Sequence, residues 1–297
     1  MAPSSSPTTI RFAYLSDTAG ASALAFVGGA VDALGWYGLF NIFTGSITGN
    51  IVIGGASYLP GITGYAPRLW ATLAFVLANV VGHFFAFAFF KVWGIPMRRV
   101  LLFLLFLEAC ALICAWVAGV VLAGAGRLDN VDEPAVALVA CLYAIAMGLQ
   151  NCAVLEACDG YPATTVVTTT LSKVGISFGE GLALSAAAAG WGPLPSAITR
   201  LDLDADGRLV AARSAAAIAR TALFRLISPV ATFSAGVVAG VGLQHRIGFH
   251  STSLPLFVII CLTISAAIPH PSEARPATAL ALTAVSAEQP QSPPQKP

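Results

Sequence analysis

Long uncharged apolar runs constrain the fold of this chain more than any other feature. A helix needs about 20 such residues to cross the hydrocarbon core of a bilayer, and only helices and closed barrels leave no backbone group unpaired there. We therefore predict an all-α fold, a polytopic membrane protein with about six transmembrane helices. The predicted crossings are residues 18–40, 69–90, 100–126, 134–155, 226–244 and 253–269.

The composition supports this class and excludes others. Of 297 residues, 57% are hydrophobic and only 10% are charged, whereas soluble domains carry about 25% charged residues. A net charge of +1 argues against nucleic acid as a partner, because nucleic-acid binding needs a basic patch. The six cysteines form no CxxC pair, and no hydrolase, P-loop or dinucleotide motif is present. We predict no enzyme, no cofactor and no metal site; the expected partners are the lipid bilayer and a small-molecule solute. The sequence neither requires nor excludes a homo-oligomer.

Basic residues near the ends of the predicted spans set the orientation. With six crossings, both basic loops lie on one side of the membrane if the N- and C-termini are cytoplasmic. Residues 18–269 would form the membrane domain, between tails at 1–17 and 270–297 whose composition is typical of disorder. The basic residues are Lys91, Arg98 and Arg99 in one loop, and Lys173, Arg200, Arg208, Arg213 and Arg220 in the other.

Two further segments, 44–55 and 164–179, are apolar but short and rich in threonine or glycine. We interpret them as re-entrant or broken helices. If both were full crossings, the chain would have eight spans. Six spans are favoured because they place both basic loops on the same side of the membrane.

The two segments also suggest an internal repeat. Thr44 and Thr164 are 120 residues apart, as are Thr48 and Thr168. Gly29 precedes Gly148 by 119 residues, and Asp32 precedes Asn151 by the same interval. The halves, about 18–126 and 134–269, would each have three spans, so the second half would be inverted. Inverted halves with broken helices that meet near the midplane are a recurring design of secondary transporters.

Asp32 is the single formal charge between Thr18 and Pro67. A lone acid at membrane depth is costly and therefore marks a functional site. Short helices that begin at the nearby threonines would aim unpaired amides at an anionic group. If helical, threonines four residues apart would share a face; alternatively, they only bond their own helix or a neighbour. The predicted substrate-binding residues are Asp32, Asn41, Thr44, Ser46, Thr48, Asn50, Gln150, Asn151, Thr164, Thr165, Thr168 and Thr170.

Four ionisable residues are candidates for ion or proton coupling: Asp32, His83, Glu108 and Lys173. Glu108 could pair with His83 across helices, either as a structural tie or as a proton relay. Lys173 would be a counter-ion for Asp32 or for an anionic solute, or else a cytoplasmic anchor that extends to the interface. Gly236 and Gly240 form a GxxxG that predicts close helix packing.

The stretches FVGGAVDALGWYGLFNIFTGSITGN (Phe26 to Asn50) and AMGLQNCAV with TTVVTTTLS (Ala146 to Ser172) carry a family resemblance. They resemble the YoaK-type family of multi-pass membrane proteins, a domain of unknown function, over about residues 20–270. Ser46 stands where that family often has Asn, and Thr169 stands where it usually has Gly. A glycine would permit the second segment to unwind, and this chain does not have it at that position. The resemblance implies a membrane domain of six or seven spans and suggests a transporter. It supplies no substrate and no catalytic residue.

The leading hypothesis is a secondary transporter for a small solute. The solute would be anionic if the unpaired amides of the short helices face it. The alternative is a non-transporting membrane scaffold or sensor whose polar residues only hold helices together. On that alternative, Asp32→Asn would harm folding and nothing else.

Overall fold

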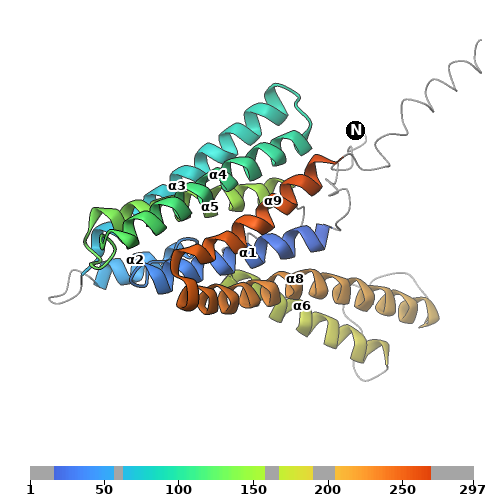
Figure 1. Cartoon of the computed structure of the whole chain (residues 1–297). Helices are drawn as coiled ribbons and strands as arrows, with labels where there is room; N and C mark the ends of the chain where they lie inside the picture. The colour runs from blue at the N-terminus through green and yellow to red at the C-terminus, as the bar shows by residue number, and fades with distance from the viewer. Residues whose placement is uncertain (1–16, 57–62, 158–166, 190–204, 269–297) are drawn as a thin grey trace, which may run out of the picture.

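The computed structural model describes residues 17–56, 63–157, 167–189 and 205–268. Within these ranges all regular structure is helical, which confirms the all-α prediction. The elements are α1 (Asp17–Gly38), α2 (Ile47–Ala56), α3 (Tyr65–Phe87) with a π-helical end η1 (Ala88–Val92), α4 (Met97–Gly124), α5 (Pro134–Ala157), α6 (Val167–Ala188), α8 (Ala205–Ile247), the 3₁₀ turn η2 (Gly248–Thr252) and α9 (Ser253–Ala267) (Figure 1).

Five stretches of the described chain are long and apolar enough to cross a membrane, which indicates a multi-pass membrane protein. Each of the first four consists largely of one of the helices α1, α3, α4 and α5, while the fifth includes both α8 and α9. The stretches are Thr18–Gly38, Tyr65–Val92, Met97–Gly124, Pro134–Glu156 and Arg213–Ala267.

The two short segments differ from each other in the structure. Helix α2 has 10 residues, a length of about 15 Å, which is half of what a crossing needs. The second segment was predicted to be re-entrant or broken. Its described part, from Val167, belongs to α6, which is continuous over 22 residues, so the broken alternative is wrong. Helix α6 passes through Gly175 and Gly179 without a break, since an interrupted backbone in an apolar environment costs more than the roughly 1 kcal/mol of a helical glycine.

Helix α8 is also longer than predicted. It has 43 residues and begins 21 residues before the predicted crossing 226–244. Its first half is rich in alanine and arginine, which favour helix without being apolar enough to mark a crossing. Hydropathy therefore detected only the second half of this helix.

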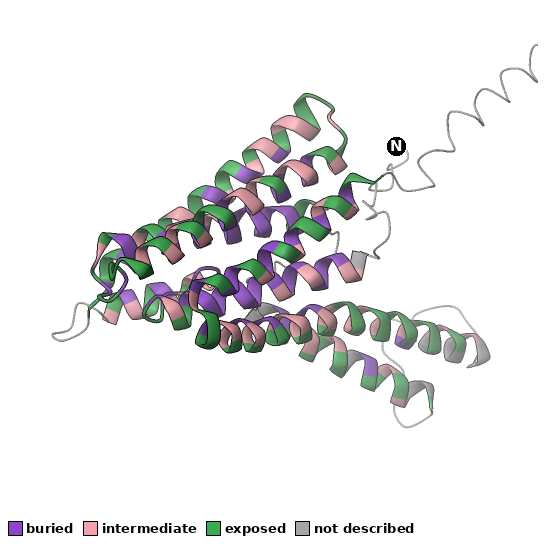
Figure 2. Cartoon of the chain, in the orientation of Figure 1, coloured by how far each residue is buried: buried purple, intermediate pink, exposed green. Residues whose placement is uncertain are grey.

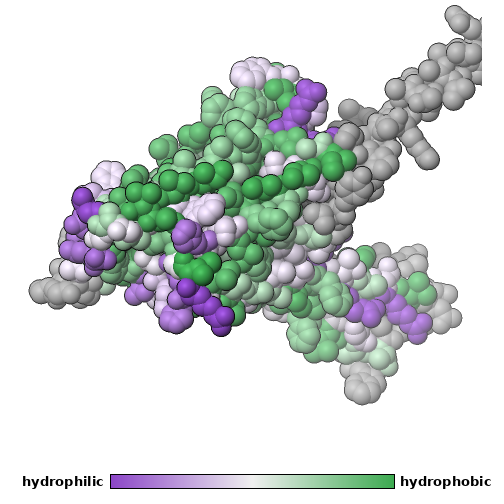
Figure 3. Space-filling model, in the orientation of Figure 1, coloured by the Kyte–Doolittle hydropathy of each residue, from purple (hydrophilic) through white to green (hydrophobic). Residues whose placement is uncertain are grey.

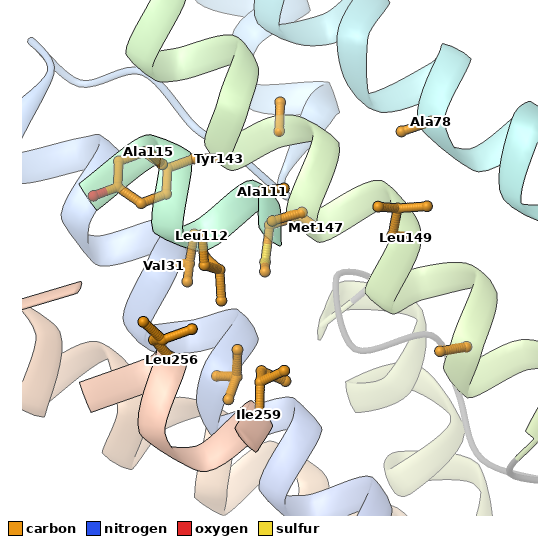
Figure 4. Close-up of a cluster of buried hydrophobic side chains, with 14 of the residues drawn as sticks. Val31, Ala78, Ala111, Leu112, Ala115, Tyr143, Met147, Leu149, Leu256 and Ile259 are labelled. Carbon is orange, nitrogen blue, oxygen red and sulfur yellow. The ribbon is translucent and has the colours of Figure 1, made fainter. Parts of the chain in front are cut away.

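Helices α1 and α5 form the centre of the bundle and are the most buried of the candidate spans (Figure 2). Side chains from α1, α4, α5 and α9 meet between them. Figure 4 shows Val31, Leu112, Met147 and Ile259 from these four helices in one cluster.

The outer surface of the bundle is apolar. On α3, Leu77 and Phe84 are about two-thirds exposed, and Phe106 and Val121 project from α4. Figure 3 shows hydrophobic residues covering much of the visible face. A monomer in water rarely exposes so large an apolar area, whereas a lipid-facing surface requires it.

Two helix pairs, α1 with α8 and α3 with α5, pack along much of their lengths. Both contacts depend on glycine. A Cβ at Gly29 of α1 would lie 2.1 Å from the carbonyl oxygen of Phe233 on α8, and one at Gly236 would lie 2.0 Å from that of Phe26. A Cβ at Gly148 of α5 would lie 2.7 Å from the carbonyl oxygen of Phe75 on α3. The predicted close packing at Gly236 and Gly240 is confirmed, because a Cβ at Gly240 would also lie within 3 Å of α1, at 2.7 Å from the carbonyl oxygen of Ala30.

Candidate functional site

The chain reverses tightly between α1 and α2, and this turn positions the first group of predicted site residues. After α1 ends at Gly38, Phe40 and Asn41 adopt positive φ angles of 55° and 61°. Such angles are uncommon outside glycine and persist only where surrounding structure holds them. Here the Arg68 Nη2 donates a 2.9 Å hydrogen bond to the carbonyl oxygen of Phe40. The turn is thereby tied to the start of α3.

The reversal brings residues 44–46 against Asp32, which is 6% exposed. The Asp32 Oδ1 accepts hydrogen bonds from the backbone amides of Thr44 (2.8 Å), Gly45 (2.7 Å) and Ser46 (3.4 Å). It also accepts one from the Thr44 hydroxyl at 3.3 Å, while the Ser46 hydroxyl donates to Oδ2 at 2.6 Å. Both carboxylate oxygens are therefore engaged by the protein itself.

This arrangement ties the loop before α2 to α1. Ser46 immediately precedes α2, so its amide is one of the unpaired amides at the electropositive start of that helix, whereas the amides of Thr44 and Gly45 belong to the loop. An anion stabilises such a start, and the Asp32 carboxylate is that anion. The sequence predicted a short helix that begins at the threonines and aims its amides at an anionic group. The helix begins at Ile47 instead, and the carboxylate that the preceding amides face belongs to the protein.

Asn50 holds the other side of the same turn. Its Oδ1 accepts from the Phe43 amide at 2.9 Å and its Nδ2 donates to the Phe43 carbonyl at 2.6 Å. Thr48 and Asn41 are exposed. Thr44 lies in the loop before α2 and is fully buried, so the condition under which Thr44 and Thr48 would share a helix face is not met.

The second group of predicted site residues makes different contacts. The Gln150 Nε2 donates to the carbonyl oxygen of Leu24 on α1 at 2.6 Å, and the Asn151 Nδ2 donates to the Asn79 Oδ1 on α3 at 3.4 Å. Leu24 lies eight residues before Asp32, about 12 Å along the helix axis. Gln150 therefore joins α5 to α1, Asn151 joins α5 to α3, and neither of these two hydrogen bonds is made to the Asp32 loop.

Of the predicted threonines in the second half, Thr170 is 3% exposed on α6. Thr164 and Thr165 lie outside the described residues, as does the side chain of Thr168.

Glu108 is the most unusual ionisable residue of the described chain. It lies on α4, is 0% exposed, and neither carboxylate oxygen has a hydrogen-bond partner among the described residues. The predicted pair with His83 does not form: the His83 Nδ1 lies 2.9 Å from the Glu156 Oε1, and both of these side chains are partly exposed. His83 on α3 pairs with α5 because those two helices are neighbours along their lengths.

Lys173, the fourth candidate for coupling, lines a groove between α6 and α8 together with Arg225. Asp32 instead bonds residues 44–46, so the described contacts do not make Lys173 its counter-ion.

Two polar residues of this region were missed by the sequence analysis. Arg68 is 6% exposed and bonds the carbonyl oxygens of Gly64 and Phe40. Asn79 receives the hydrogen bond of Asn151. A single arginine next to a long apolar run is a signal that could have identified Arg68. Asn79 has no comparable signal, because one amide in an apolar run is common.

A family model described as "Protein of unknown function (DUF1275)" matches residues 20–265. This match covers all the helices that carry the candidate site. No curated protein and no solved structure matches the chain.

Proposed function

The chain belongs to the DUF1275 family of proteins of unknown function, and we propose that it is a secondary transporter for a small solute, built from two inverted halves. The support comes from the paired packing of its helices. If α1 corresponds to α5 and α3 to α8, the two glycine-dependent pairs, α1 with α8 and α3 with α5, are the same contact made twice.

The residues at these contacts agree with that correspondence. Gly29 and Gly148 are 119 residues apart, and their partners Phe233 and Phe75 are 158 apart. The same two intervals also relate a second contact of one helix pair to a contact of the other pair. Gly82 of α3 meets Leu149 and Cys152 of α5, while Gly240 of α8 meets Ala30 and Ala33 of α1.

Each of these partners obeys the intervals found at the first contact: Gly82 and Gly240 are 158 residues apart, and Ala33 and Cys152 are 119 apart. A chance similarity between two apolar helices would not reproduce the same two sequence intervals at both contacts of the helices α1, α3, α5 and α8. This agreement is the observation on which the proposal depends, because inverted repeats that pack against each other are typical of transporters that alternate access around a central site.

We assign ion coupling to Glu108. An unpartnered carboxylate in an apolar interior is costly when ionised, and the cost falls when it carries a proton. The carboxyl group of Glu108 would be stable in its protonated form while enclosed and in its ionised form when exposed to water. It can therefore move a proton as the halves rearrange.

The test begins with the purified full-length protein in detergent and a panel of small anions, amino acids, nucleobases and sugars. A bound solute raises the melting temperature by mass action. Any solute that does so is then tested for uptake into proteoliposomes. Uptake above that of protein-free liposomes would support the proposal. If no solute of the panel shifts the melting temperature or enters the liposomes, the transporter proposal loses its support.

Glu108→Gln tests the coupling role. Glutamine has nearly the same shape and no charge, so we expect the melting temperature to change by less than the equivalent of about 1 kcal/mol. Solute uptake driven by a proton gradient should fall at least about tenfold, whereas exchange of labelled for unlabelled solute without a gradient should continue. Unchanged gradient-driven uptake would remove Glu108 from the mechanism.

One observation favours the alternative of a non-transporting scaffold. Asp32, the residue expected to bind solute, is engaged by residues 44–46 through five hydrogen bonds. On this alternative its loop is purely structural, and variants of Asp32 would change stability alone.

A further inference from the structure

A groove of about 650 Å³ lies between α6 and α8, on the side of the bundle away from α4 (Figure 1). Both helices are largely exposed here (Figure 2). The groove is lined by Lys173, Ile176, Ser177, Ser214, Ala217, Ile218, Thr221, Ala222, Arg225 and Leu226.

The lining combines two cations with hydroxyls and has no acidic member. Lys173 projects from α6 and Arg225 from α8, and no described carboxylate forms an ion pair with either. The Thr221 hydroxyl donates to the carbonyl oxygen of Ala217, so its oxygen remains an acceptor. The hydroxyls of Ser177 and Ser214 are therefore the neutral donors of the groove. Two cations with hydroxyl donors suit a phosphate oxyanion.

The rest of the lining is apolar and continues onto open surface. Ile176 and Ile218 are 61% and 68% exposed. Leu226, the last lining residue on α8, is the first residue of the predicted crossing 226–244, so the end of the groove at Arg225 adjoins the lipid.

The position along α8 agrees with such a ligand. Arg225 immediately precedes the predicted crossing 226–244. It therefore lies at the depth of the lipid headgroups. In the orientation predicted from the basic loops this is the cytoplasmic side, where anionic lipids attract juxtamembrane lysine and arginine.

We propose that the groove between α6 and α8 binds an anionic phospholipid. Lys173 and Arg225 hold its phosphodiester, and the apolar residues of the crossing that begins at Leu226 contact its acyl chains. This proposal goes beyond transport and does not depend on it, because its readout is lipid binding.

The experiment uses the full-length protein in a neutral detergent and native mass spectrometry. Phosphatidylglycerol and phosphatidylcholine with the same acyl chains are offered in equal amounts. We expect phosphatidylglycerol to be retained preferentially, and the double variant Lys173→Gln, Arg225→Gln to lose at least about tenfold of that preference. Arg225→Lys preserves the charge and should retain most of it.

Arg246→Gln is the matched control, since it removes one exposed cation from the far end of the same helix. An equal loss of preference in Arg246→Gln and in the double variant would overturn the proposal, because it would reflect overall charge only. Inorganic phosphate and glycerol phosphate form the second arm. Displacement of the lipid by either at comparable concentration would overturn the lipid assignment, since the acyl chains would then contribute nothing. A melting temperature within a few degrees of the wild type verifies that each variant is folded.

Discussion

Gly236→Ala should destabilise the protein by about 3 kcal/mol and lower the yield of folded protein in detergent. The added Cβ would lie 2.0 Å from the carbonyl oxygen of Phe26, so α1 and α8 would have to separate by about 1 Å. Overpacking of this kind typically costs about 1–3 kcal/mol, and a backbone carbonyl cannot move aside as a flexible side chain does. Melting temperature and monodispersity on size exclusion measure the effect.

Gly242→Ala provides the matched control on the same helix. Its added Cβ would meet nothing within 4 Å, so we expect a change of at most about 1 kcal/mol, in the stabilising direction. Equal melting temperatures for the two variants would contradict the packing described for α1 and α8.

The same reasoning extends to the proposed repeat. Gly29→Ala and Gly148→Ala occupy equivalent positions, at 2.1 and 2.7 Å from a facing carbonyl oxygen. Both should be destabilising, with Gly29→Ala the more severe. If Gly148→Ala were neutral, the two helix pairs would not be equivalent contacts.

The sequence predicted the helical class and the limits of most helices because both follow from hydropathy. The predicted run 18–40 corresponds to α1, and 134–155 corresponds to α5, within two residues at each end. Hydropathy did not detect the alanine-rich half of α8, and it did not show that α6 is continuous. In both cases local helix propensity and backbone pairing decide the structure, and neither is visible as an apolar run.

Three of the predicted site residues lie together because local chain reversal brings them into contact. Asp32, Thr44 and Ser46 are within 14 residues of one another, and the turn after α1 places them in contact. The prediction failed for contacts that depend on which helices are neighbours. Glu108 was expected near His83, but His83 pairs with Glu156 because α3 packs along α5. A single sequence carries little information about such neighbours.

Asp32→Ala should cost about 3–5 kcal/mol, the usual range when one partner of a buried charged network is removed. The amides of Thr44 and Gly45 and the Ser46 hydroxyl would lose their acceptors in a buried position. Asp32→Asn should cost only about 1–2 kcal/mol, because its Oδ1 still accepts from the amides. Thr48→Ala, at an exposed position of the same segment, should change stability by less than about 0.5 kcal/mol.

The order of these variants separates the two roles considered for Asp32. A side chain that only holds the loop needs an acceptor but no charge. The Asp32→Asn variant should then be much more stable than Asp32→Ala, and any solute uptake should follow stability. A solute-binding or coupling carboxylate requires the charge, so Asp32→Asn should remain folded and lose uptake. The described hydrogen bonds occupy both oxygens, so solute would have to displace residues 44–46 to reach Asp32. Uptake lost in a stable Asp32→Asn variant would therefore mean that the turn before α2 opens during transport, and uptake retained would assign Asp32 to the architecture alone.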